Sequence, residues 1–381
     1  MQSTTIYRGL SPINGRAVEV RTEQGKITAI SPTDAAVDRW IAPGLIDIQV
    51  NGYAGVDYNT PEAPLEELAR SIAAQRAAGV TRLLPTVITG SAKNMTGSLR
   101  NLARARRELP EAVSFAGFHV EGPWISPDDG PRGAHPKEHV RAASVEEFDR
   151  FQDAAEGGIR LLTLAPESPG AIPVIEHAVD RGVIVAIGHC NSDRKAIADA
   201  IRAGATMSTH LGNGAHSHVP RHDNYILFQM AADELWAGLI VDGVHLPAEF
   251  VKVAVRAKGL DRIILVTDAV PPAGCQPGAY RFGHLDVELT PDMRVQLRDS
   301  GRLAGSALSM DRGLENLMRF AGLSWLDALR SATVNPARAM GFASRSEFLE
   351  VGQTADLMLC DYDAESRQIQ VRETIVADRT I

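Results

Sequence analysis

Three features are scarce in this 381-residue chain: cysteine, aromatic residues and long apolar segments. Its three cysteines, Cys190, Cys275 and Cys360, lack Cys-x-x-Cys spacing and are too few for a disulfide framework, so we expect reduced thiols. No segment approaches the ~20 apolar residues that span a bilayer, and the N-terminal sequence has no basic segment followed by an apolar stretch. We therefore expect a cytoplasmic protein without membrane contact.

The chain also lacks a surplus of basic residues. Its formal net charge is −8, with acidic and basic residues interspersed, which disfavours nucleic acid and anionic membranes as partners. The composition is otherwise that of an ordinary globular protein, with 44% hydrophobic, 23% charged and 5% aromatic residues. Any anionic ligand must therefore be bound by local groups.

A repeated order of helix, glycine and apolar strand runs through the middle of the chain. Amphipathic segments end near Gly79, Gly182, Gly204 and Gly259, and an apolar run of the kind found in buried strands follows each glycine. Eight such apolar runs alternate with helical segments, which favours an α/β fold closed as a (β/α)8 TIM-type barrel over an open sheet. We assign residues 41–344 to this barrel as the metal-dependent catalytic domain.

Both ends of the chain have a different pattern, with short alternating strands separated by turn residues. We predict that residues 1–40 and 345–381 pair as a small β-sandwich domain. The chain exceeds the ~250 residues of a typical barrel, which leaves room for such a unit. A strand-like stretch with turns at 278–305 predicts a β-insertion near the mouth of the barrel.

Four apolar runs end in side chains suited to a hydrolytic metal site: Glu121, His189, His210 and Asp268. A parallel barrel gathers its chemistry at the C-terminal rim, so these side chains should meet there. A glutamate with two histidines meets the ligand count of a catalytic zinc site, which keeps one position for water. We predict that Glu121, His189 and His210 bind one divalent metal ion, with Zn²⁺ favoured although iron and cobalt accept the same ligands.

Several of these side chains have a plainer interpretation as well. Asp268 is predicted to act as general base and then general acid, but an aspartate there could also cap the next turn. A single buried histidine is commonly just a hydrogen-bonded polar residue, and only the set of three favours a metal. His119 shares a strand face with Glu121 and is predicted to orient a ligand without binding metal. Cys190 is either a nucleophile or a small packed residue, and we favour packing.

The first barrel strand has polar side chains on one alternating face, at Asp47, Gln49 and Asn51. Glutamine and asparagine are poor zinc ligands beside imidazole and carboxylate. We therefore predict one catalytic metal ion, with Gln49 and Asn51 in supporting positions around it.

Short motifs occur in a fixed order along nearly the whole chain: PGLIDIQVNG (43–52), HVEGPW (119–124), RGAH (132–135), IGH (187–189), THLGN (209–213), DGVH (242–245), TDA (267–269), LAGSAL (303–308) and ATVNPARAMG (332–341). Together they resemble the amidohydrolase superfamily, and within it the N-acetylglucosamine-6-phosphate deacetylases. The resemblance implies hydrolysis of the N-acetyl group of an amino-sugar phosphate, most simply N-acetylglucosamine 6-phosphate, by a homodimer. Members of the superfamily often have a His-x-His pair in the first barrel strand. Here Gln49-x-Asn51 replaces that pair, which resembles the single-metal deacetylases.

The resemblance also implies roles for residues that spacing alone leaves unassigned. His135 matches the group that polarises the acetyl carbonyl or steadies the oxyanion. Asn213, Gly214, Arg221 and His245 match groups around the sugar phosphate. An arginine offers a planar fork for phosphate oxygens, which agrees with such a role for Arg221.

The sequence departs from the family in THLGNGAHSHVPRHDN, where members continue with an Asn-Ala-Met type of sequence. Gly214 replaces a small residue, and His216, His218 and His222 are unexpected. These histidines indicate a modified phosphate pocket, the site of another substrate or a polar loop, and we favour a loop with altered substrate preference. An amidohydrolase for another N-acyl or cyclic amide compound and a non-catalytic sugar-phosphate sensor are the alternative functions.

Overall fold

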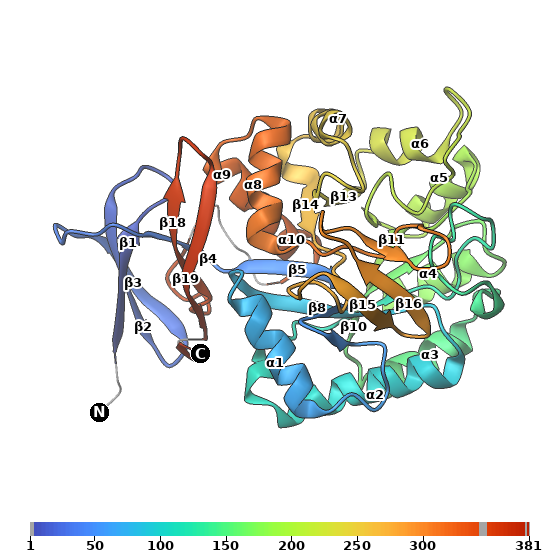
Figure 1. Ribbon diagram of the computed structural model, residues 1–381, viewed down its shortest axis with the longest axis horizontal. Coiled ribbons are helices and arrows are strands. Elements are labelled where there is room, and N and C mark those ends of the chain that lie inside the picture. Colours follow the sequence, from blue (N-terminus) through green and yellow to red (C-terminus); the bar gives the residue numbers. More distant parts are fainter. Residues whose placement is uncertain (1–3, 343–348, 378, 381) are drawn as a thin grey trace.

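The computed structural model describes residues 4–342, 349–377 and 379–380, and its centre is a barrel of parallel strands (Figure 1). Eight strands form one sheet in the order β14 (Ile263–Val266), β13 (Trp236–Ile240), β12 (Met207–Ser208), β11 (Ile184–Ile187), β10 (Ile159–Leu164), β9 (Phe118–Glu121), β8 (Val80–Ile88) and β5 (Leu45–Val50). A parallel bridge between Val50 and Ala269 joins the two edges of the sheet. The predicted (β/α)8 barrel is confirmed.

Helices follow the strands and cover the outside of the barrel (Figure 1). They are α1 (Leu65–Arg76), α2 (Ala92–Glu108), α3 (Val145–Ala154), α4 (Ala171–Asp180), α5 (Arg194–Arg202), α6 (Tyr225–Ala231), α7 (Ala248–Lys258), α8 (Met310–Ala321), α9 (Trp325–Ala332) and α10 (Val334–Ala339), with short 3-10 turns η1 (Pro110–Ser114), η2 (Lys137–His139) and η3 (Leu260–Arg262). None of the helices described is long and apolar enough to cross a bilayer.

The glycine between helix and strand has a physical requirement at Gly79. Its φ is +86°, in the left-handed region that side chains disfavour, and a Cβ added there would lie 2.5 Å from the Met358 sulfur. The position therefore needs glycine both for the turn and for the close approach of the terminal sheet. This is the order of helix, glycine and strand that the sequence pattern predicts.

Apolar side chains from most of the barrel strands meet in one buried cluster inside the barrel, among them Ile46, Leu84 and Ile264. Helix α10 contributes Ala337 to the same cluster. A second, larger cluster lies between the strands and the surrounding helices. Because both faces of the sheet are buried, each strand end is held rigidly at the rim.

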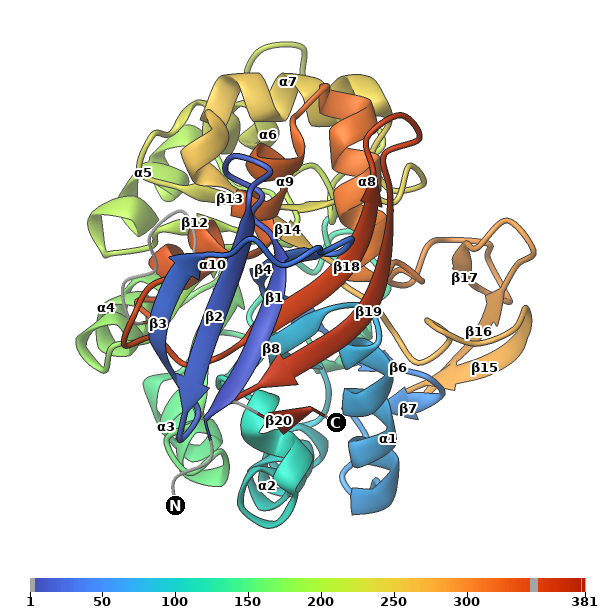
Figure 2. The ribbon, with the colours of Figure 1, turned by 90° about the vertical axis from the view of Figure 1, so that its left-hand side faces the viewer.

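The two ends of the chain pair with each other as predicted (Figure 2). Their seven-stranded sheet has the order β20 (Arg379–Thr380), β19 (Gln368–Val376), β18 (Leu357–Asp363), β4 (Trp40–Pro43), β1 (Thr5–Leu10), β2 (Ala17–Glu23) and β3 (Lys26–Pro32). Strands from both ends enclose a separate apolar core that includes Val20, Ile41 and Leu357. This sheet runs on to Pro43, past the predicted boundary at residue 40, and the boundary at 345 lies outside the described residues.

A bidentate ion pair joins the terminal sheet to the barrel. Arg82 of β8 donates from Nε to Asp356 Oδ2 at 2.7 Å and from Nη2 to Oδ1 at 3.1 Å. Asp356 is buried, and its backbone oxygen accepts from Gly44 N at 2.9 Å. Two parallel charge-assisted bonds fix the relative orientation of the two units.

A three-stranded antiparallel sheet lies beside the barrel mouth within the stretch predicted as a β-insertion (Figure 2). It consists of β15 (Gly278–Phe282), β16 (Leu285–Leu289) and β17 (Val295–Leu297). Asp57, at the end of the hairpin of β6 (Gly52–Tyr53) and β7 (Val56–Asp57), accepts from Gly283 N at 2.5 Å. This contact ties the tip of the insertion to the barrel.

Candidate metal centre and active site

The polar strand ends converge at one rim of the barrel. Glu121 is the last residue of β9, and His189, His210 and Asp268 each come two residues after β11, β12 and β14. Their φ angles are +50°, +28° and +48° for His189, His210 and Asp268 in turn, a region that costs residues other than glycine about 1–3 kcal/mol. Strain at three equivalent strand ends is tolerated because it turns each side chain towards the same point.

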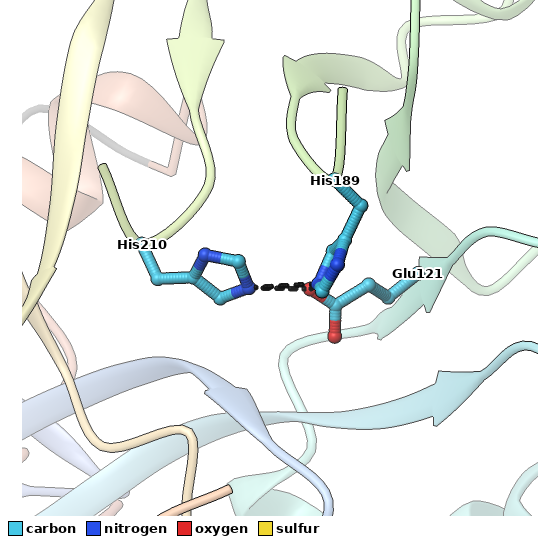
Figure 3. A group of neighbouring side chains, drawn as sticks. All are labelled: Glu121, His189 and His210. Atoms are coloured by element: carbon cyan, nitrogen blue, oxygen red, sulfur yellow. Dashed lines mark hydrogen bonds and ion pairs between the residues drawn. The ribbon is translucent and has the colours of Figure 1, made fainter. Parts of the chain in front are cut away.

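Three of these side chains form a compact triangle (Figure 3). His210 Nε2 lies 3.0 Å from His189 Nε2 and 3.1 Å from Glu121 Oε1, and His189 Nε2 lies 3.3 Å from that oxygen. Tetrahedral ligands about 2.0–2.1 Å from a Zn²⁺ ion are about 3.3 Å from one another, so the observed edges suit that geometry. The triangle therefore fits a small divalent cation on the donor atoms alone.

The electrostatics of the triangle also favour a cation. Burial alone would raise the pKa of Glu121, but the adjoining imidazoles of His189 and His210 outweigh it and hold the pKa well below its usual range. Burial opposes charge on His210 as well, yet the bond to Glu121 raises the pKa of that imidazole. An ionised carboxylate in a water-poor rim is thus available to a positive charge.

The outer nitrogen atoms of the two histidines differ in their surroundings. His189 Nδ1 lies 2.8 Å from the carbonyl of Pro131, so Nδ1–H is the donor and the Nε2 lone pair faces the triangle. Such a carbonyl partner orients a ligand histidine and fixes its tautomer. His210 Nδ1 is buried and has no hydrogen-bond partner among the described residues.

Asp268 lies beside the triangle and is held by amides of the first strand. Asn51 Nδ2 donates to Asp268 Oδ1 at 2.7 Å, and Gln49 Nε2 lies 3.3 Å from the same oxygen and 3.0 Å from Glu121 Oε1. Burial, together with the charge of Glu121, raises the pKa of Asp268 to about 6. A carboxylate with a raised pKa accepts and returns a proton near neutral pH.

These residues line a cavity of about 520 Å³, a size typical of small-molecule sites. Its wall includes all three residues of the triangle and Asp268. The cavity also extends to the β-insertion, which contributes Phe282 and, after β17, Arg302. The cavity therefore combines three side chains that could hold a metal ion, a carboxylate whose pKa is raised, and room for a small molecule.

The model of the amidohydrolase family matches residues 40–381. The chain belongs to the amidohydrolase family. The N-acetylglucosamine-6-phosphate deacetylase of Bacillus subtilis (strain 168) is 34% identical over 369 residues, covering 96% of this chain and 91% of that protein. The N-acetylgalactosamine-6-phosphate deacetylase of Shewanella sp. (strain ANA-3) is also 34% identical, over 340 residues, covering 88% of this chain and 83% of that protein.

A solved structure agrees with these sequence comparisons. It is an aspartate-to-alanine mutant of N-acetyl-D-glucosamine-6-phosphate deacetylase from Mycobacterium smegmatis, in complex with N-acetyl-D-glucosamine-6-phosphate. The two chains are 29% identical with a TM-score of 0.86, and the match covers 96% of this chain and 94% of that one. This amidohydrolase therefore shares its fold with a deacetylase over nearly the whole chain. It is a hydrolase of amide bonds.

In this amidohydrolase, His135 lies beside the triangle, and its role towards the acetyl carbonyl stays a prediction. It lines the cavity, its ring lies 4.3 Å from that of His189, and its Nδ1 is 2.8 Å from Thr89 Oγ1. Burial, with the neighbouring His189, holds the pKa of His135 well below its usual range, so the ring is neutral. Sequence reasoning missed Thr89, because a lone threonine after a strand has no distinguishing pattern.

Among the described residues, His119 forms no side-chain hydrogen bond to the triangle. Its Nε2 lies 2.8 Å from Thr163 Oγ1, which is 2.6 Å from Thr209 Oγ1, next to His210 in the chain. Burial lowers the pKa of His119 to about 4. Its predicted role in orienting a ligand is therefore limited to this indirect route through two threonines.

The residues matched to the sugar phosphate are divided between the cavity and the surface. Asn213 and His245 line the cavity. Asn213 Nδ2 is a buried donor without a partner among the described residues, and His245 Nδ1 lies 2.7 Å from Asp242 Oδ2. Arg221 is exposed and does not line the cavity within this chain, so its contact with phosphate stays a prediction.

Gly214 has a clear requirement for glycine. Its φ is +54°, and an added Cβ would lie 2.8 Å from His189 Nδ1. The loop backbone therefore passes directly over a predicted metal ligand, which leaves Gly214 lining the cavity with backbone only. The glycine that departs from the family pattern is explained by this close approach.

Two further residues answer questions that the sequence left open. Arg302 is the one arginine among the described residues that line the cavity, and no motif singled it out. Cys190 is buried, and burial raises the pKa of its thiol to about 12. A thiol that stays protonated is a poor nucleophile, which favours the packing interpretation of Cys190.

Proposed function

We propose that this amidohydrolase removes the N-acetyl group from an amino-sugar phosphate, with N-acetylglucosamine 6-phosphate the leading substrate. The observation that carries the proposal is the triangle of Glu121, His189 and His210 with Asp268 in one cavity, in a chain that matches deacetylases over nearly its whole length. Relatives named for the glucosamine and the galactosamine epimers reach equal identity, 34%. The glucosamine epimer is favoured because it recurs across more of the relatives.

The metal ion proposed here is one Zn²⁺, held by Glu121 Oε1 and the Nε2 atoms of His189 and His210. When bound, a divalent cation at this position lowers the pKa of a water molecule and polarises an amide oxygen. Two nitrogen donors and one carboxylate form a common catalytic zinc set. Gln49 and Asn51 act on carboxylate oxygens through their amide N–H groups, which agrees with one ion rather than two.

Asp268 is proposed to move the proton in both halves of the reaction. Its carboxylate takes a proton from the attacking water and later delivers it to the amino nitrogen as the C–N bond breaks. The bond from Asn51 keeps the other oxygen, Oδ2, free for this exchange. The products are acetate and the free amino sugar phosphate.

His135 is proposed to stabilise the oxygen of the acetyl group as negative charge develops on it. If Thr89 donates its hydroxyl proton to His135 Nδ1, the neutral ring carries its proton on Nε2 and is a hydrogen-bond donor. Neutrality follows from its lowered pKa. A fixed donor aimed at developing charge commonly contributes about 10²–10³-fold to the rate.

A substrate panel tests the proposal. Acetate release should occur with N-acetylglucosamine 6-phosphate, and its kcat/KM should exceed that of unphosphorylated N-acetylglucosamine by about 100-fold, since each charge-assisted hydrogen bond to phosphate stabilises by about 1.5–3 kcal/mol. N-Acetylgalactosamine 6-phosphate decides the epimer. Equal rates with and without phosphate would favour the alternative amidohydrolase, and binding without acetate release would favour the sensor.

Two expectations about the setting of this enzyme also belong to the proposal. A homodimer and a cytoplasmic location follow from the family resemblance and the sequence. The oligomeric state is measured directly by light scattering of the purified chain.

A further inference from the structure

One of the three unexpected histidines differs from the others in its surroundings. The loop between β12 and α6 carries His216, His218 and His222, and His216 alone of these lines the cavity. His218 and His222 are exposed, whereas His216 is half-buried. The proposed reaction gives His216 no role, although it directly follows Asn213-Gly214-Ala215, where the family has its Asn-Ala-Met continuation.

Tyr225, the first residue of α6, holds His216 by two contacts. The backbone N–H of His216 donates to the Tyr225 hydroxyl at 2.8 Å, and His216 Nδ1 lies 3.0 Å from the same oxygen. Tyr225 is 5% exposed, and burial raises its pKa, so the phenol keeps its proton. The imidazole is thus anchored to a helix rather than free on a mobile loop.

The two contacts are satisfied together by one tautomer of His216. In that tautomer the Tyr225 oxygen accepts from the backbone N–H and donates its own proton to Nδ1. A neutral imidazole that accepts at Nδ1 must carry its hydrogen on Nε2. A protonated imidazole carries one there as well. Nε2 is therefore a hydrogen-bond donor in either state, and it has no partner among the described residues.

The neighbouring backbone restricts His216 further. A Cβ added to Gly130 would lie 2.9 Å from His216 Cα, so the loop after β9 packs directly against it. Asn224 caps α6 by accepting from Leu227 N at 2.9 Å, and its Nδ2 donates to Pro220 O at 2.9 Å. The segment from Pro220 to Tyr225 is therefore fixed at both ends. Such preorganisation makes a donor effective because little entropy is lost on binding.

We propose that His216 is a specificity-determining residue that donates its Nε2–H to the anionic phosphate of the substrate, with Tyr225 as its positioning residue. The inference rests on the proposed deacetylase function and assigns the phosphate contact to a residue within the cavity, where Arg221 is absent. A methionine at this position would fill similar space but donate nothing.

Variants at His216 and Tyr225 test the assignment by steady-state kinetics of acetate release. H216M should raise KM for N-acetylglucosamine 6-phosphate about 10-fold or more with kcat nearly unchanged, because one charge-assisted bond is lost. H216Q, whose amide places an N–H near the position of Nε2, should recover most of the affinity. Y225F removes the anchoring hydroxyl and should raise KM by about 3- to 10-fold.

Two comparisons separate the contact from a structural effect. The kcat/KM for unphosphorylated N-acetylglucosamine should be the same in H216M and the wild type, since no phosphate is present. H218M, at an exposed histidine of the same loop, should match the wild type with both substrates. H216M that retains wild-type KM for the phosphorylated sugar, or that weakens both sugars equally, would overturn the assignment while leaving the deacetylase function standing. Wild-type protein without acetate release would overturn both.

Discussion

Asp268→Asn should lower kcat by about 10²–10⁴-fold, the range that general acid–base groups contribute. Asparagine keeps the size of the side chain and an oxygen for the Asn51 bond, but its amide neither takes a proton from water nor delivers one to the amine. Folding and metal content should stay as in the wild type, because Asp268 is not one of the triangle ligands. Kinetics of acetate release with metal analysis of the same sample provide the measurement.

A matched control for Asp268 lies at the other end of strand β14. Asp261 lies just before β14, at the opposite end of the barrel, and is an exposed aspartate paired with Arg330. Asp261→Asn should leave kcat unchanged. An Asp268→Asn enzyme with wild-type kcat would remove Asp268 from the mechanism and return it to the capping role that its turn also allows.

Glu121→Gln should have the second large effect, on both metal content and rate. The substitution keeps the shape but removes the one negative charge among the three proposed ligands, and its amide N–H faces the two histidine nitrogens at about hydrogen-bond distance. We expect less than one metal ion per chain and a fall in kcat/KM of about 10³-fold or more, since Lewis-acid stabilisation amounts to several kcal/mol. Elemental analysis and acetate release measure the two effects.

An exposed carboxylate checks that the loss is local. Glu234 lies just before β13, at the N-terminal end of the barrel. Glu234→Gln should keep both metal and activity. Circular dichroism should show that the wild type, Glu121→Gln and Glu234→Gln are folded alike. Full metal content in Glu121→Gln would remove Glu121 from the proposed set of metal ligands.

The sequence was sufficient to locate the barrel and the triangle for a simple physical reason. Strands of a parallel barrel all end at one rim, so Glu121, His189 and His210 at three strand ends must lie near one another even though up to 89 residues separate two of them. Alternation along a strand also placed Gln49 and Asn51 on one face, and both contact Asp268. The period of apolar residues and the order of the strands along the chain can both be read from a single sequence.

Residues that act across the cavity were beyond this kind of reasoning. Thr89, which contacts His135, and Arg302, which reaches the cavity from the β-insertion, are set by how separate loops pack together. The position of Arg221 shows the converse, because the resemblance assigned it to the sugar phosphate while its side chain lies at the surface. Contacts between loops depend on tertiary packing that no spacing rule determines. Asp242, which contacts His245, could have been found from the sequence, because both residues belong to the DGVH motif.

Metal content measured together with activity tests the central claim most directly. Purified protein should contain one divalent metal ion per chain, lose acetate release after exhaustive chelation, and regain it when one equivalent of Zn²⁺ is added. Protein that is metal-free and still fully active would contradict the account.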